Sequence, residues 1–228
     1  MELGYRKEIL KKIYDIYEEF IKDFDLACQK GCSACCTRNV TLTSLEAYAI
    51  IDDINENKKK DLFETLNIEE KRKRFHPKIT INKMADLCSR EQDLPQEEAA
   101  SPLWGRCPLL TDKTCPVYEN RPFECRSFCS RANCEEQGVA DIDPLIVSAN
   151  NVIRQFIEHI DSFGVTGNLT DMLLYLGETG NKEIMRGNDD ELAENLINNG
   201  PATVLMIPPE HREKLQDLIQ SLQSIKLN

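Results

Sequence analysis

Apolar residues recur at three- and four-residue steps along much of this chain, which is the period of an α-helix with one buried face. Over residues 5–27 this spacing predicts a first helix, with Lys and Glu on the opposite side. Residues 143–163 repeat the pattern behind an Asp143–Pro144 pair that suits the start of a helix. The same spacing predicts helices over 168–176, 189–199 and 209–225.

Local signals predict the remaining elements. The segment Thr43-Ser-Leu-Glu46 has the form of a capping box and predicts a second helix from that point. The highly charged residues 58–78 predict a helix and an exposed turn, in which residues 71–75 (KRKRF) form a solvated face close to preceding glutamates. Only residues 202–207 have strand character. We therefore expect an all-α protein with little or no sheet.

Charge narrows the possible partners. The 228 residues include 28 basic and 39 acidic side chains, a formal net charge of −11, which disfavours nucleic-acid binding. No apolar run approaches the ~18 residues that a membrane span needs. The N-terminus is charged where a signal peptide would be apolar, which favours a cytoplasmic location. We expect neither a nucleic-acid nor a membrane partner.

The cysteines are unusual in number and in distribution. All ten fall between positions 28 and 134, and none lies in the C-terminal third. In a reducing compartment, such a cluster indicates metal binding or redox chemistry more than a disulfide scaffold. The even count also allows five disulfides, although a stapling framework has little reason to omit one third of the chain.

Two groups of cysteines carry the candidate chemistry. Cysteines three residues apart can reach one metal from a single turn, and a proline after a cysteine stiffens the loop that presents the sulfur. We expect the two groups to meet in space around a metal ion. The candidate ligands are Cys28, Cys32, Cys35 and Cys36 in the first group, and Cys107, Cys115 and Cys125 in the second, with Cys88, Cys129 and Cys134 as weaker candidates.

Other residue types add little to this set. Arg121 and Arg126 lie close to the second group in sequence and are candidates to balance the negative charge of metal-bound thiolates. His76, His159 and His211 lie outside both groups, so we expect ligation by cysteine alone. Such ligation suits zinc and iron, including a [4Fe-4S] cluster, and the spacing does not separate one site from two.

The second group continues as a longer motif, Cys107-Pro-Leu-Leu and then Cys115-Pro-Val-Tyr-Glu-Asn-Arg-Pro-Phe-Glu-Cys125-Arg. Together with Cys32, Cys35 and Cys36, it resembles a cysteine-cluster family of the CxxCxxCC type, described as zinc- or iron-chelating domains. The resemblance covers about residues 28–130. It departs at Cys28, which lies one residue before the family's position. It implies a metal held by the shared cysteines.

Two classes of function follow. The first is a metal-binding protein that holds zinc or an iron–sulfur cluster, for metal handling or as a binding module. The second is an iron–sulfur redox protein or a methyl-transfer enzyme, because flagellin lysine-N-methylases have a related cysteine pattern. For both we expect helices around a cysteine-rich, loop-dense metal-binding centre. Residues 1–142 would form the cysteine-cluster domain with the N-terminal helix, and residues 143–228 a helical region packed on it.

Overall fold

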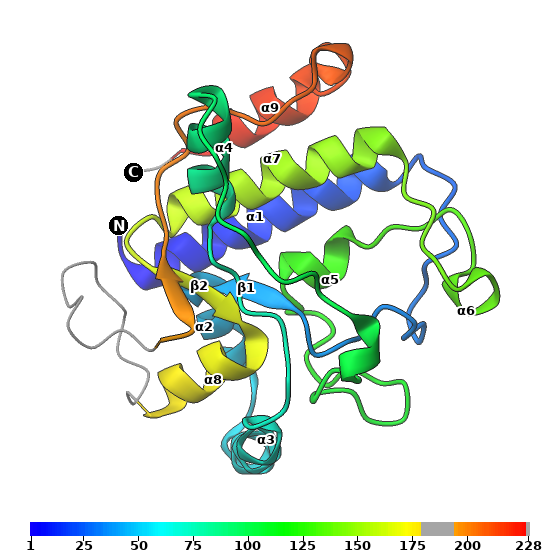
Figure 1. Ribbon diagram of the computed structural model, residues 1–228, viewed down its shortest axis with the longest axis vertical. Helices are drawn as coiled ribbons and strands as arrows, with labels where there is room; N and C mark the ends of the chain where they lie inside the picture. The colour runs from blue at the N-terminus through cyan, green and yellow to red at the C-terminus, as the bar shows by residue number, and fades with distance from the viewer. Residues whose placement is uncertain (179–193, 227–228) are drawn as a thin grey trace.

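The computed structural model describes residues 1–178 and 194–226 and is mostly helical, as the apolar periodicity predicts (Figure 1). A small sheet holds three short strands, β1 (Thr41–Thr43), β2 (Val165–Asn168) and β3 (Leu196–Asn198). In chain order the α-helices are α1 (Leu3–Ile21), α2 (Ser44–Asp53), α3 (Glu56–Glu69), α4 (Ile81–Ser89), α5 (Phe123–Ser127), α6 (Cys134–Gln137), α7 (Pro144–Ile160), α8 (Leu169–Glu178) and α9 (Gln216–Gln223). None of the described helices is both long enough and apolar enough to cross a membrane.

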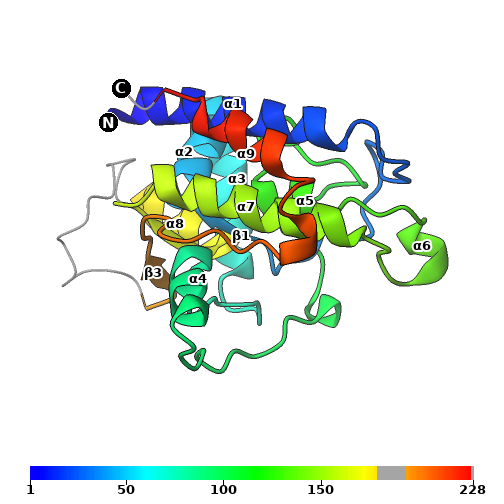
Figure 2. The same cartoon turned by 90° about the horizontal axis from the view of Figure 1, so that it is seen from above.

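The long helices α1 and α7 lie side by side, and α9 packs along both of them (Figures 1 and 2). Their facing sides bury Ile13 and Tyr17 of α1, Ile153 of α7 and Leu218 of α9. Burial of such side chains contributes about 1.5–3 kcal/mol each. This core joins the two ends of the chain.

A second core lies between α2, α8 and the sheet. Leu42, Ile50 and Leu173 are buried there. The three strands are antiparallel in the order β1-β2-β3, with Leu42 opposite Gly167. A Cβ at Gly167 would meet the end of the Leu196 side chain of β3, which would have to shift.

Several helix starts agree with the sequence. Thr43 caps α2, and its capping box with Glu46 is complete, as predicted. Asp143 caps α7, and Pro144 is its first residue. Helix α8 matches the predicted helix over 168–176 except at Asn168, which ends β2. Helix α1 ends at Ile21 instead of continuing to residue 27, so the chain is already a loop when it reaches Cys28.

Other expectations at the element scale are wrong. Residues 202–207 form no strand, and within the predicted helix over 189–199 the described residues 196–198 form β3, while 189–193 lie outside the described residues. The predicted helix over 209–225 is a short 3-10 turn followed by α9. Helix α4 was not expected, although Thr80 caps it by accepting a hydrogen bond from the Lys83 amide.

The charged segment 58–78 also departs from expectation. Helix α3 ends at Glu69, and Arg74 is buried instead of lying on a solvated face. The Arg74 Nε donates to Asp171 Oδ2 of α8 at 2.8 Å. The pairing is long-range, so the charge pattern of the segment alone could not reveal it.

Candidate metal centre

The loops that carry the two cysteine groups are hydrogen-bonded to each other. The Cys107 amide donates to the Cys36 carbonyl at 3.1 Å, and the Arg38 amide donates to the Gly105 carbonyl at 3.1 Å. Between these two bonds, Thr37 and Arg106 form an isolated antiparallel bridge. The two groups therefore meet in space, as the sequence predicts, although about 70 residues separate Cys36 from Cys107.

Helix α5 brings Cys125 to the same place. Its first residue, Phe123, donates its amide hydrogen to Glu46 Oε1 at 2.7 Å and packs edge-on against Tyr17 with ring centroids 4.8 Å apart. Glu46 belongs to the capping box of α2, and Tyr14 of α1 donates to the same carboxylate at 2.9 Å. Two long-range anchors thus fix the short helix on which Cys125 lies.

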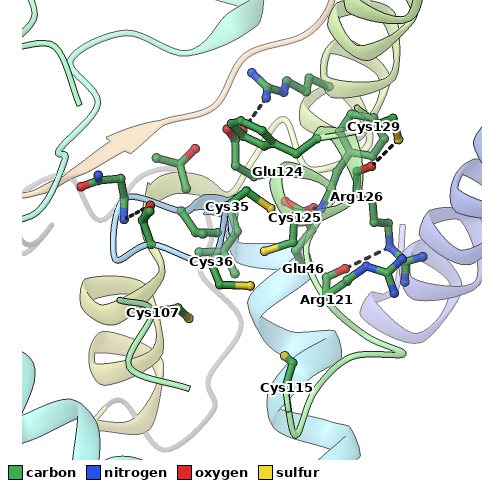
Figure 3. Close-up of a pocket in the computed structure, with 18 of the residues that line it drawn as sticks. Cys35, Cys36, Glu46, Cys107, Cys115, Arg121, Glu124, Cys125, Arg126 and Cys129 are labelled. Atoms are coloured by element: carbon green, nitrogen blue, oxygen red, sulfur yellow. Dashed lines mark hydrogen bonds and ion pairs between the residues drawn. The ribbon is translucent and has the colours of Figure 1, made fainter. Parts of the chain in front are cut away.

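These elements surround a cavity of about 880 Å³. Figure 3 shows the sulfur atoms of Cys35, Cys36 and Cys125 pointing toward one another, while Cys107 and Cys115 approach the same space from their own loops. We call these five side chains the inner thiols. Eight cysteines line the cavity: Cys28, Cys32, Cys35, Cys36, Cys107, Cys115, Cys125 and Cys129.

The two Cys-Pro turns direct amide hydrogens at their own sulfurs. The Leu109 and Leu110 amides donate to Cys107, and the Val117 amide donates to Cys115. These bonds lower the pKa of each thiol, because they favour its thiolate form. Burial acts more strongly in the opposite direction and raises the pKa of Cys107 to about 12. It also raises the pKa of Cys125, with further increases from Cys107 and Cys36.

Cys36 has the opposite shift. A hydrogen bond from its neighbour Cys35 is the main cause that lowers the pKa of Cys36 to about 7, and the charge of Arg106 contributes as well. The same hydrogen bond and burial raise the pKa of Cys35. Arg106 also donates to the Ser33 carbonyl at 2.7 Å. Arg106 was not predicted as a site residue, although its position next to Cys107 was a signal in the sequence.

The two predicted arginines have different surroundings. The Arg121 guanidinium stacks on the Tyr118 ring at 3.9 Å, and its charge lowers the pKa of Cys115, although burial raises that pKa more. Arg126 is buried and donates to the Arg121 carbonyl at 3.1 Å and to Glu18 of α1 at 2.6 Å. The hydrogen bonds of Arg126 therefore brace the loop against α1.

The remaining cysteines lie outside the inner thiols. Cys88 is exposed on α4 and does not line the cavity. Cys129 is buried beside α7 and donates to the Arg126 carbonyl at 3.1 Å. Cys28, Cys32 and Cys134, which we call the outer thiols, lie where the loop after α1 meets the segment that leads into α6.

The donor chemistry of the inner thiols fits a thiophilic metal, but their positions do not yet close around one ion. Within residues 1–178 and 194–226, no group of three or more Cys, His, Asp or Glu side chains is arranged so that it could hold a metal ion. The sulfurs lie on loops and on the short helix α5, not within long helices. Metal binding would therefore have to draw these loops together.

Comparison of the chain with protein-family models, with curated proteins and with solved structures finds no match. A mostly helical fold is compatible with many activities. The case for a function therefore comes from the chemistry of the cavity, where thiols from distant parts of the chain face one another.

Proposed function

We propose that this protein binds a thiophilic metal, zinc or iron, through Cys36, Cys107, Cys115 and Cys125, as a metal-binding protein of the cysteine-cluster type. The observation that carries the proposal is that these four thiols line one cavity, on chain segments that are far apart in the sequence. Thiols must be reduced to bind metal, so the proposal includes a reducing compartment, the cytoplasm. The helices would then pack around a cysteine-rich centre.

Electrostatics supports a cation at this position. Several buried thiols close together raise one another's pKa, because their thiolates repel. A bound metal ion removes that penalty by replacing the thiol protons with its own positive charge. The amide hydrogens aimed at Cys107 and Cys115 already favour sulfur in its anionic form.

Each candidate ligand has a definite support. The pKa of Cys36 is lowered, so less free energy is needed to deprotonate this thiol for metal binding. Cys107 and Cys115 lie on proline-stiffened turns, and Cys125 lies on the anchored helix α5. When bound, the metal would supply cross-links between three loops, and an iron–sulfur centre would add electron transfer.

The test is metal analysis of protein purified without oxygen. We expect stoichiometric zinc or iron. The substitutions Cys36→Ser and Cys115→Ser should each weaken the affinity for the metal by at least about tenfold and lower the metal content of the purified protein. Cys88→Ser is the matched control, because that thiol is exposed and distant from the cavity. Equal metal content in all three variants would overturn the proposal.

One observation favours the second class of function, an iron–sulfur redox protein or methyl-transfer enzyme. Besides the cysteines, the cavity is lined by Val40, Phe75 and Met84 and by Arg154 of α7, which leaves room for an organic substrate beside the metal. A structural site needs no such space. Absorption near 400 nm with iron and acid-labile sulfide would support this class, whereas colourless protein with zinc would support a binding module.

A further inference from the structure

The outer thiols Cys28 and Cys134 come together from distant parts of the chain. Cys28 Sγ accepts a hydrogen bond from the Ser130 amide at 3.2 Å and donates to the Phe128 carbonyl at 3.2 Å. The Ser130 hydroxyl donates to the Ala132 carbonyl at 2.7 Å, and Cys134 Sγ approaches the same carbonyl at 3.8 Å. The two sulfurs thus lie on either side of one short turn.

Cys134 is the better partner for Cys28 among the neighbouring thiols. Cys134 contacts the carbonyl of Ala132, in the same turn whose Ser130 amide is hydrogen-bonded to Cys28. Cys129 is buried, whereas Cys134 is only half-buried. Cys28 itself is exposed, so a dissolved oxidant can reach it. Neither Cys28 nor Cys134 belongs to the four proposed metal ligands.

We infer that Cys28 and Cys134 form a redox-active dithiol, separate from the metal centre, that a small-molecule disulfide such as oxidised glutathione converts to an internal disulfide. The Cys28 thiolate attacks one sulfur of the oxidant, forms a mixed disulfide and releases one thiolate. The Cys134 thiolate then attacks the Cys28 sulfur and releases the second. Two protein thiols lose two protons and two electrons, and the oxidant is reduced to two thiols.

The product would tie the loop after α1 to the start of α6. In the reduced protein, these segments are joined through the hydrogen bonds of Cys28 and through the bond from the Ala27 amide to the Ser130 carbonyl at 2.9 Å. A covalent link at this position would hold one wall of the cysteine cavity in place, since Cys28 lines it. The redox state of the pair would thereby set the mobility of that wall.

The test uses the full-length protein in glutathione buffers of graded ratio, followed by alkylation of free thiols, trypsin digestion and mass spectrometry. Cleavage after Lys and Arg places Cys28 on residues 23–30, Cys134 on residues 132–154, Cys129 on residues 127–131 and Cys32 on residues 31–38. Each possible partner therefore gives a distinct cross-linked peptide. We expect a link between 23–30 and 132–154 and a mass loss of about 2 Da.

Two variants separate the steps. Cys134→Ser should trap the mixed disulfide of Cys28 with glutathione, whereas Cys28→Ser should lower formation of any cross-link from Cys134 by at least about tenfold. Cys88→Ser is the control, because the exposed Cys88 takes no part in the exchange and its loss should leave the link between Cys28 and Cys134 unchanged. A link from Cys28 to residues 31–38, or separate glutathione adducts on Cys28 and Cys134 in the unsubstituted protein, would overturn the inference. Metal content of the same samples reports on the metal proposal independently.

Discussion

The carboxylate of Glu46 joins a local helix signal to the cysteine loops. Its Oε2 accepts the Thr43 amide at 2.8 Å and so completes the capping box of α2. Its Oε1 accepts the Phe123 amide and the Tyr14 hydroxyl. The capping role is visible in the sequence, but the second role depends on chain segments 32 and 77 residues away.

Glu46→Ala should lower the free energy of unfolding by about 3 kcal/mol, because it leaves the buried donors of Phe123 and Thr43 without a partner. It should also weaken metal binding, since helix α5 would lose one of its anchors. Denaturant unfolding and metal titration check both effects. Glu64→Ala is the control: Glu64 is exposed on α3, and its loss should change stability by less than about 0.5 kcal/mol. Similar effects of the two substitutions would contradict this account of α5.

Asp161 predicts a pH dependence of stability. It is buried under hydrogen bonds from Ser44 and the Leu45 amide and an ion pair with Arg6, and burial raises its pKa from 3.8 to about 6. The folded state therefore binds the proton more tightly than the unfolded state. Stability falls as pH rises from about 4 to about 6, and at pH 7 the charged form costs about 3 kcal/mol relative to the neutral form.

The measurement is the unfolding free energy at pH 4.5 and at pH 7 for the unsubstituted protein and for Asp161→Asn. Asparagine cannot ionise, so the variant should lack the decrease in unfolding free energy that deprotonation of Asp161 causes between the two pH values. It should be less stable than the unsubstituted protein at both pH values. The raised pKa values of the half-buried Glu124 and the buried Glu158 remain in both proteins and cancel in the difference. The same pH slope in both proteins would show that Asp161 does not titrate in this range.

At the scale of elements, the junction of the two cysteine loops depends on one glycine. Gly105 has a φ of 127°, and a Cβ there would lie 2.6 Å from the Arg38 guanidinium, which is paired with Glu69 at 3.0 Å. Its carbonyl accepts the amide of the same Arg38. Gly105 thus allows the chain before Cys107 to approach the loop after Cys36.

Gly105→Ala should therefore lower the free energy of unfolding by about 1–3 kcal/mol and separate the two loops, with a parallel loss of metal affinity. Gly4→Ala is the control, because a Cβ at Gly4 meets no atom within 4 Å and alanine favours the helix. Thermal unfolding and metal titration of both variants provide the comparison. An unchanged metal affinity in Gly105→Ala would show that the junction does not position the sulfurs.

Elements could be predicted where their signal is local. The caps Thr43 and Asp143 specify their helices from within a few residues, and both helices begin where predicted. Strand β3 could not be predicted in this way, because Leu196 becomes a strand residue by pairing with β2. Arg74 is buried for the same kind of reason, since its partner Asp171 lies 97 residues away.

At the scale of the whole molecule, order in the cysteine loops has two sources. Leu109, Val117 and Phe123 are buried in the cores, so packing holds part of the segment that the cysteines occupy. The tip at Lys113 is exposed and has a φ of 60°. The inner thiols are not closed around an ion, so their relative positions would depend on the metal.

Removing the metal should therefore loosen these loops while the helical cores persist. After treatment with a strong chelator, we expect most of the far-ultraviolet circular dichroism to remain and the first proteolytic cleavages to fall between residues 100 and 135, with Lys113 as an exposed trypsin site. Metal-loaded protein is the reference. Unchanged protease resistance in verified metal-free protein would mean that packing alone orders the segment.

The sequence by itself determined the helical character of the chain, the capped starts of α2 and α7, and the residue types of the candidate site, because periodicity, capping and cysteine spacing act over a few residues. It also indicated that the two cysteine groups would meet. Only the tertiary structure decided which thiols share a cavity, that Cys88 does not line it, and that Arg106 lies beside Cys36. Those relations depend on hydrogen bonds and packing between segments far apart in the chain, which no local pattern encodes.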